Sequence, residues 1–377
     1  MDDTKVTQEI SLTRVLIKGV LLFLAINLLF VPLAPIHKLG QLSAYNVIFP
    51  GRPRLPYGEN PDQAYNFSLF NLEAMFASHE LSAGNKPAGE YRVLFIGDSS
   101  VWGYLLTPDE TLAAQVNAAS LTLKDGRIVR AYNLGYPTLS LTKDLLILKY
   151  GLRYHPDLII WLLTLESVPV KKQLDSPILE NNPSEAQNLI TQFSLNLDLH
   201  DPRFVNSSFL DSTLIGQRRT LADLVRLQLY GVMWSATGID QYYPATYEPP
   251  QKDLTKDDTF QGLQPPKLFP QDLSLDVLQA GKTLSGDVPV IYVNEPIYLS
   301  NGENSDLRYN FFYPRWAYDQ YRLLFSQICQ SKGWQCLDEW NLVPPNEFTN
   351  SAIHMTSHGT QLLASEIDKI ILSQSDP

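Results

Sequence analysis

Two segments far apart in the chain carry a serine and a histidine, residue types that together can perform nucleophilic catalysis. The first is an apolar run, Phe95-Ile96, that ends in Gly97-Asp98-Ser99 and is soon followed by a helical pattern. A serine at the carboxyl end of a strand in an open α/β sheet lies where such sheets place their ligands. Ser99 is therefore a candidate nucleophile. The alternative is a plain strand-to-helix turn, in which Gly, Asp and Ser are ordinary residues.

The second segment runs from Asn350 to Gly359 and contains His354 and His358. A histidine on the loop before the last helix can reach a serine at the sheet edge and accept its proton. The alternative for His354 is an ordinary surface histidine. The four-residue spacing of the histidines would suit a metal on a shared helix, but no Glu lies between them and no third ligand is evident. We expect neither a metal nor a cofactor.

The elements around these segments predict an α/β fold. Short apolar runs that favour strands occur at residues 91–96, 128–132, 157–163 and 288–293. Helical patterns occur at residues 69–78, 111–119, 141–150, 316–332 and from 356 onward. Strands that alternate with helices and are apolar on both faces indicate a parallel sheet covered by helices.

Two stretches interrupt this alternation. Residues 37–88 are rich in Pro, Gly, Asn and Tyr, and we interpret them as a connecting segment packed on the main domain. From about 171 to 286 the chain carries many Pro, Asn, Asp and Gln residues. We expect an insertion or cap over the sheet there, with a helix that begins after Asn182 and has Pro183 at its first position.

The N-terminal region contains a candidate membrane span. Residues 19–36 carry no charge, and residues 15–17 extend the apolar run past Lys18. About 20 apolar residues cross a bilayer as a helix, so we predict a transmembrane helix at 15–36. A cleaved signal peptide is an alternative that the sequence after the apolar run fits badly. A buried core helix is the other alternative, although every face of the segment is apolar.

Three basic residues precede the span more closely than the basic residues that follow it, which favours a cytoplasmic tail of residues 1–14. The main domain, residues 89–377, would then lie outside the cytoplasm. Cys329 and Cys336 would either pair in that oxidising compartment or remain two free thiols.

Composition limits the class of protein. The 377 residues include 40 acidic and 29 basic side chains, a net charge of −11. This charge argues against a nucleic-acid partner, which would require a basic surface. An apolar fraction of 44% excludes global disorder, and two cysteines exclude a disulfide scaffold.

Together the two segments resemble the SGNH/GDSL hydrolase superfamily, particularly its membrane-anchored branch in bacterial envelopes. The resemblance covers about 90–170 and 287–375 and leaves the insertion unexplained. Gly97-Asp98-Ser99 matches the first block of the family, and His354 matches the last. The resemblance implies a three-layer α/β/α fold and ester-directed acyl transfer, with Ser99 as the nucleophile and His354 as the base.

The chain departs from the family in the groups that would bind the oxyanion. The second block usually ends in a Gly whose N–H binds the oxyanion, and Thr138 takes that place, with Gly135 slightly earlier. The third block is normally Gly-x-Asn-Asp, and Leu165 stands where the side-chain donor is expected. Thr164 is the neighbouring candidate donor. Losing one such donor typically costs about 10²–10³ in rate.

The last block also departs from the family pattern. The Asp normally found three residues before the histidine is Ser351, with Asn350 one step further away. Either residue can orient His354, but neither carries the charge that stabilises an imidazolium. An acid from elsewhere, such as Glu295, is a further alternative.

These features predict a membrane-tethered serine esterase or O-acyltransferase of the cell envelope. The family branch implies that its substrates are acyl esters of glycans and that a membrane-bound acyltransferase is a possible partner. The alternative is a catalytically inactive SGNH-like accessory that binds glycan or a membrane partner. Leu165 and the missing Asp are the features that keep this alternative open.

Overall fold

The computed structural model describes residues 11–39, 42, 44–48, 51–56, 71–204, 208–237 and 246–374. Five parallel strands form one sheet in the order β2-β1-β3-β4-β5. Their bounds are β1 Glu90–Ile96, β2 Ile128–Asn133, β3 Leu158–Leu163, β4 Val290–Asn294 and β5 Gln335–Asp338. The four predicted strands are present, and β5 is an addition that the sequence analysis did not predict.

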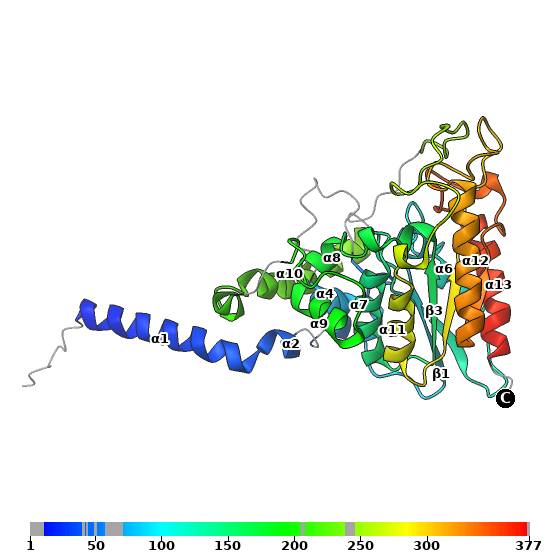
Figure 1. Cartoon of the computed structure of the whole chain (residues 1–377). Coiled ribbons are helices and arrows are strands. Elements are labelled where there is room, and N and C mark those ends of the chain that lie inside the picture. The colour runs from blue at the N-terminus through cyan, green and yellow to red at the C-terminus, as the bar shows by residue number, and fades with distance from the viewer. Residues whose placement is uncertain are drawn as a thin grey trace, which may run out of the picture.

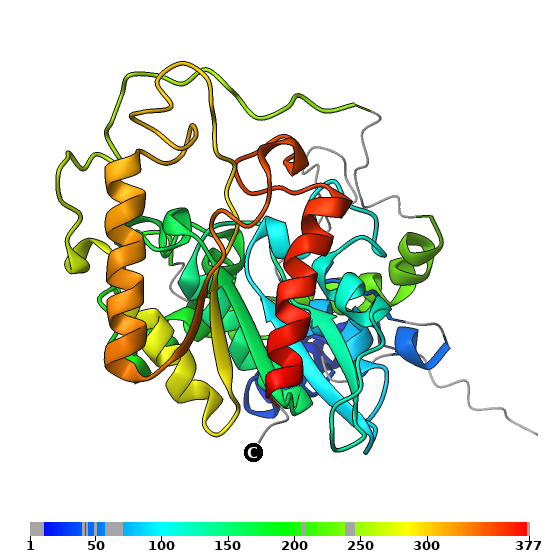
Figure 2. The same ribbon diagram turned by 90° about the vertical axis from the view of Figure 1, so that its right-hand side faces the viewer.

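Helices cover both faces of the sheet (Figures 1 and 2). Val93 and Phe95 of β1 pack in the same cluster as α6 (Leu112–Ala118) and α13 (Ser357–Ser373). Leu94 and Ile96 point to the other face, where the cluster includes residues of α7 (Leu141–Gly151), α11 (Leu275–Ser285) and α12 (Arg315–Lys332). This alternation follows from the two-residue period of a strand. The predicted three-layer α/β/α fold is confirmed.

The predicted insertion contains one helix of this three-layer body. Residues 171–286 include α8 (Pro177–Glu180), α9 (Pro183–Phe193), α10 (Arg218–Thr237) and also α11. Gly281 of α11 lies so close to Trp161 of β3 that a Cβ atom would come within 2.3 Å of the indole. The insertion proper therefore ends before α11, and α11 is the helix that precedes β4.

The N-terminal helix α1 spans Leu12–Leu33, three residues earlier at each end than predicted. It ends because Ala34 adopts a left-handed conformation and Pro35 follows it. Apart from Asn27 its side chains are largely exposed, and it is long and apolar enough to cross a membrane. Residues 1–10 of the predicted cytoplasmic tail lie outside the described residues.

The connecting segment contains α2 (Pro35–Leu39), α3 (Ala44–Ile48) and α4 (Leu72–Ser78), while residues 57–70 lie outside the described part. Its residue Arg54 is fully buried and donates to the carbonyls of Trp102, Gly103 and Leu106. The Arg54 guanidinium also stacks over the Trp102 ring. The segment therefore holds the turn that follows Ser99.

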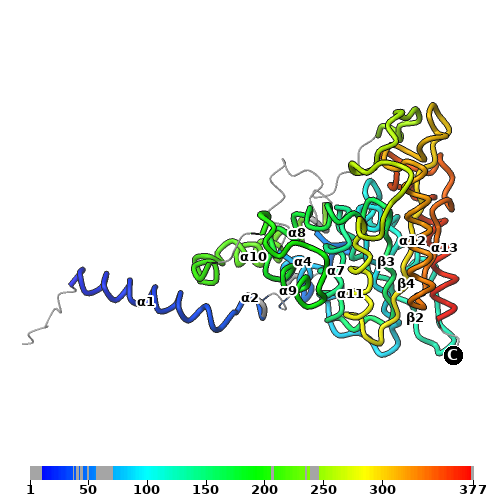
Figure 3. Tube along the Cα trace, in the orientation of Figure 1, coloured from blue at the N-terminus to red at the C-terminus, as the bar shows by residue number. Residues whose placement is uncertain are grey.

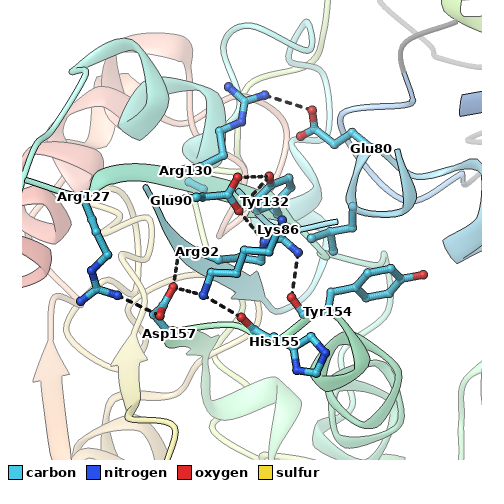
Figure 4. Close-up of polar contacts among 12 residues, drawn as sticks. Glu80, Lys86, Glu90, Arg92, Arg127, Arg130, Tyr132, Tyr154, His155 and Asp157 are labelled. Carbon is cyan, nitrogen blue, oxygen red and sulfur yellow. Dashed lines mark hydrogen bonds and ion pairs between the residues drawn. The ribbon is translucent and has the colours of Figure 1, made fainter. Parts of the chain in front are cut away.

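A polar network holds the strands together at their amino ends (Figure 4). Asp157 accepts hydrogen bonds from the Arg92 backbone N–H, from Lys86 and from Arg127. The largely buried Arg92 side chain also donates to the Tyr154 carbonyl. These contacts fix the register of β1 against β3, whose opposite ends carry the candidate site.

Cys329, near the end of α12, and Cys336 of β5 form a disulfide with their Cα atoms 6.2 Å apart. The alternative that Cys329 and Cys336 are two free thiols therefore does not hold. The bond joins α12 to the edge strand that follows it.

Candidate active site

Ser99 and His354 meet at the carboxyl edge of the sheet. Ser99 is the first residue of α5 (Ser99–Trp102), directly after β1. His354 lies on the loop between β5 and α13. The Ser99 Oγ atom is 2.8 Å from His354 Nε2. Two half-buried side chains that are 255 residues apart in sequence therefore share a hydrogen bond.

The other imidazole nitrogen of His354 contacts Asn350. The distance from His354 Nδ1 to Asn350 Oδ1 is 2.8 Å. Because an amide oxygen only accepts hydrogen bonds, Nδ1 carries the proton in this arrangement. Nε2 is then the unprotonated nitrogen and accepts from the Ser99 hydroxyl. This is the tautomer that a general base for Ser99 requires.

The loop geometry decides between the two residues predicted to orient His354. The Thr349 N–H donates to the His354 carbonyl at 2.8 Å, and Phe348 pairs with Met355 in an antiparallel bridge. This closed loop brings the Asn350 side chain to the imidazole. The Ser351 hydroxyl accepts from the Ile353 N–H instead, and the two imidazole nitrogens are hydrogen-bonded to Ser99 and Asn350.

The environment of His354 favours the neutral imidazole. Burial lowers the pKa of His354 to about 4. The Tyr104 ring covers the imidazole, with their centroids 4.6 Å apart. The sequence analysis missed Tyr104, whose only signal is its place directly after the helix that carries Ser99.

Two backbone N–H groups are available for an oxyanion. The N–H groups of Ser99 and Thr138 have no hydrogen-bond partner in the part of the chain that the structure describes. Thr138 has a φ of 135°, in a region that favours glycine and strains a β-branched residue. This conformation explains physically why glycine suits the position. The Thr138 hydroxyl lies 3.0 Å from Ser176 Oγ.

The two remaining candidate donors are already engaged elsewhere. The Gly135 N–H donates to Asn133 Oδ1, and a Cβ at Gly135 would lie 2.2 Å from the Trp102 nitrogen. Gly135 therefore allows the loop after β2 to approach the end of α5. The Thr164 hydroxyl donates to the Tyr313 hydroxyl, and its N–H donates to Ser167 Oγ.

Two buried carboxyl groups contact Ser100, the residue after the candidate nucleophile. Asp98 Oδ1 accepts from the Ser100 N–H, and the Ser100 hydroxyl donates to Glu295. Burial and the neighbouring Asp98 carboxylate raise the pKa of Glu295 well above its usual value. Asp98 Oδ2 and Glu295 Oε1 have no other donor among the described residues, so a shared proton satisfies both. Glu295 thus contacts Ser100 and is not the partner of His354.

A cavity of about 470 Å³ is lined in part by Tyr104 and Asn350, the two residues that contact the His354 ring. Its wall combines aromatic rings with a carboxylate and amide groups. The lining residues are Tyr104, Leu105, Thr246, Tyr247, Glu248, Pro249, Gln251, Phe311 and Asn350. The predicted insertion thus contributes one wall of the cavity.

No protein-family model matches the chain, and no curated protein matches it significantly. Among solved structures, the chain is similar to a carbohydrate acetylesterase family member from Sinorhizobium meliloti, with 12% identity and a TM-score of 0.33 over 76% of this chain and 99% of that one. It is also similar to an aryl esterase from M. smegmatis, with 13% identity and a TM-score of 0.35 over 75% and 98%. A lipase/acylhydrolase from Enterococcus faecalis has 14% identity and a TM-score of 0.36 over 75% and 96%.

These similarities are too low to transfer an activity to this chain. The sheet order, the serine directly after β1 and the histidine before the last helix come from the chain itself. They match the blocks on which the sequence resemblance depended. The fold is the three-layer α/β/α fold that the sequence resemblance implies.

Proposed function

We propose that the protein is a serine ester hydrolase or acyltransferase with Ser99, His354 and Asn350 as its catalytic groups. The observation that carries the proposal is the chain of two hydrogen bonds, each 2.8 Å long, that joins these three side chains. In this arrangement the hydroxyl, its base and the group that orients the base are in the order that nucleophilic catalysis needs.

The proposed reaction proceeds through an acyl-enzyme. Ser99 Oγ attacks the ester carbonyl while His354 Nε2 takes the hydroxyl proton, and the N–H groups of Ser99 and Thr138 bind the oxyanion. The tetrahedral intermediate collapses, and His354 gives its proton to the departing alkoxide oxygen. Water or an acceptor hydroxyl then attacks the acyl carbonyl, with its proton taken by His354 and returned to Ser99 Oγ.

The cavity supports a sugar ester as the substrate. Tyr104, Tyr247 and Phe311 offer apolar ring faces, while Glu248 and Gln251 offer polar groups that can bind hydroxyls. Ligand sites commonly combine an apolar wall with a few polar groups that fix orientation. We therefore propose acyl esters of cell-envelope glycans, with α1 as a membrane anchor and the main domain outside the cytoplasm. A membrane-bound acyltransferase partner remains part of this proposal.

Labelling with a fluorophosphonate probe tests the catalytic assignment. We expect the full-length protein in detergent to be labelled at Ser99, and Ser99→Ala and His354→Ala to lose the label. Ser351→Ala is the matched control, because that serine lies on the same loop as His354 and its hydroxyl accepts from the Ile353 N–H. If the probe labels a known esterase but not this protein, the inactive accessory becomes the better interpretation. Comparing the products formed with and without an added sugar acceptor distinguishes acyl transfer from hydrolysis.

Membrane fractionation tests the anchor. Because insertion of α1 depends on apolar area, the protein should stay with membranes in high salt and leave them only in detergent. Release by salt alone would contradict the anchor, and an N-terminus found cleaved after α1 would favour a signal peptide.

A further inference from the structure

Helix α10 of the insertion presents an apolar stripe that no described part of the chain covers. Val225, Leu229 and Met233 are 58%, 68% and 40% exposed. They are spaced four residues apart, so they lie on one face of the helix. Three further large apolar side chains are exposed on the segment that leads into α10. These are Phe209, Leu210 and Ile215.

The opposite face of α10 is fixed to the body of the protein. Leu224 and Leu227 are buried in a small cluster with Ala74 of α4, and Ile36 of α2 packs against it. The exposed stripe is therefore held in a defined orientation. In Figures 1 and 3, α10 and α1 extend from the same side of the three-layer body.

A hydrogen bond joins the segment before α10 to the candidate membrane helix. The Ile215 N–H donates to Asn27 Oδ1 at 3.1 Å, and Asn27 Nδ2 donates to the Phe23 carbonyl at 2.9 Å. Asn27 lies six residues before the end of α1 at Leu33. At 1.5 Å per residue, Ile215 meets α1 about 9 Å below that end. Amphipathic helices in a bilayer interface insert their apolar faces to a depth of about 5–10 Å.

The charged side chains near the apolar stripe of α10 favour contact with lipid headgroups. Arg218, Arg219 and Arg226 are exposed on α10, and the acidic residue of the helix, Asp223, is buried and paired with Arg226. Arginines beside an apolar stripe are typical of helices that lie on anionic bilayers. The −11 charge of the whole chain makes this basic helix a local exception.

We propose that α10 and the segment before it lie in the interface of the bilayer that α1 crosses. The occupant of the apolar stripe is lipid, continuous with the lipid around α1. Because both α1 and α10 contact the same membrane, they fix the angle of the main domain relative to the bilayer. A single flexible tether would leave this angle free. The inference rests on the proposed membrane anchoring of α1 and is independent of the catalytic proposal.

Environment-sensitive fluorophores on single introduced cysteines test this inference in the full-length protein. The two native cysteines form a disulfide and leave the label to the new site. Leu229→Cys reports the stripe, and Leu22→Cys reports the middle of α1. Leu323→Cys is the matched control, because this exposed leucine lies on α12, in the three-layer body. The protein is reconstituted in vesicles of phosphatidylcholine and phosphatidylglycerol, with nitroxide-labelled lipids as quenchers.

We expect blue-shifted emission from the Leu229 site and quenching by nitroxides near the glycerol backbone. The Leu22 site should be quenched by nitroxides near the chain ends, and the Leu323 site by neither. Aqueous emission at the Leu229 site with a quenched Leu22 site would overturn the inference and leave the anchor intact. A blue shift at the Leu229 site without lipid quenching would mean that protein, a second copy or another part of the chain, covers the stripe, and it would also overturn the inference. An unquenched Leu22 site would overturn both the anchor and the inference, while fluorophosphonate labelling reports the catalytic proposal separately.

Discussion

Replacing Asn350 with aspartate tests how His354 works without a carboxylate. The substitution puts a negative charge where the Asn350 amide oxygen now lies, 2.8 Å from His354 Nδ1. For charge centres about 4 Å apart and an effective dielectric constant near 20, the attraction is about 4 kcal/mol. That corresponds to about 3 pKa units. Because Asn350 is exposed, solvent screening reduces this shift to roughly 2 units.

The pH profile should change in a defined direction. Burial holds the pKa of His354 at about 4, so the wild-type base is neutral above that pH and kcat/KM should fall only near pH 4. In Asn350→Asp the added carboxylate raises the pKa of His354, and the acid limb of the profile moves to higher pH with it. Below the new pKa the variant is slower than wild type, because its imidazole is protonated. Above it, stabilisation of the imidazolium should raise kcat by about 10-fold or more.

The assay is hydrolysis of a soluble ester by the full-length protein in detergent, from about pH 3 to pH 9, so that the acid limb of wild type lies inside the range. Asn350→Ala removes the partner of Nδ1 and should lower kcat, and His354→Ala should abolish activity. Ser351→Asp is the matched control for added charge, since the Ser351 hydroxyl accepts from the Ile353 N–H. An acid limb at the same pH in wild type and Asn350→Asp would refute the reasoning. Unchanged activity in His354→Ala would remove the catalytic assignment.

Three further predictions concern stability. Thr138→Gly should relieve the backbone strain at φ 135° and raise the free energy of unfolding by about 1 kcal/mol. Activity should be retained, because the backbone N–H remains. Urea unfolding measures the stability, and ester hydrolysis measures the activity. Gly135→Ala should lower the free energy of unfolding by at least about 1–3 kcal/mol and should also lower kcat, because its Cβ would lie 2.2 Å from the Trp102 nitrogen. The same two assays apply. Replacing Cys329 and Cys336 together by Ala should cost about 2.5 kcal/mol by loop entropy, and a reducing agent should lower the melting temperature of wild type but not of the variant.

Local patterns in the sequence were enough to predict a parallel sheet covered by helices, and the family resemblance implied the three layers. The strands are apolar on both faces and most helices have clear periods, so four strands could be located without tertiary information. Strand β5 was missed because it has four residues, none of them fully buried, and no continuous apolar run. Helix α11 was assigned to the insertion because irregular sequence precedes it, although its packing on β3 belongs to the core.

Sequence motifs were enough to predict the two central residues of the candidate site. They were not enough to predict the contacts that depend on how the loop before α13 closes. Ser99 and His354 follow from the end of β1 and the start of the last helix. The choice of Asn350 over Ser351 depends on the contact between Thr349 and the His354 carbonyl, which one-dimensional spacing does not encode. The pairing of Asp98 with Glu295 could not be predicted from the sequence either, since about 200 residues and three strands (β2, β3 and β4) separate them along the chain.

The buried carboxyl groups of Asp98 and Glu295 lie beside the turn that carries Ser99, so their charge acts on the proposed oxyanion site. Two ionised carboxylates at Asp98 and Glu295 would repel negative charge developing at the N–H groups of Ser99 and Thr138. The raised pKa of Glu295 removes one of these charges. Lys143 is fully buried, pairs with Asp144 and donates to the Gly97 carbonyl at 2.8 Å, so it holds the same turn in place. The neutral Asn350 amide orients the imidazole but gives the imidazolium little stabilisation. On the proposed mechanism, catalysis therefore relies on binding the oxyanion and on orienting the imidazole.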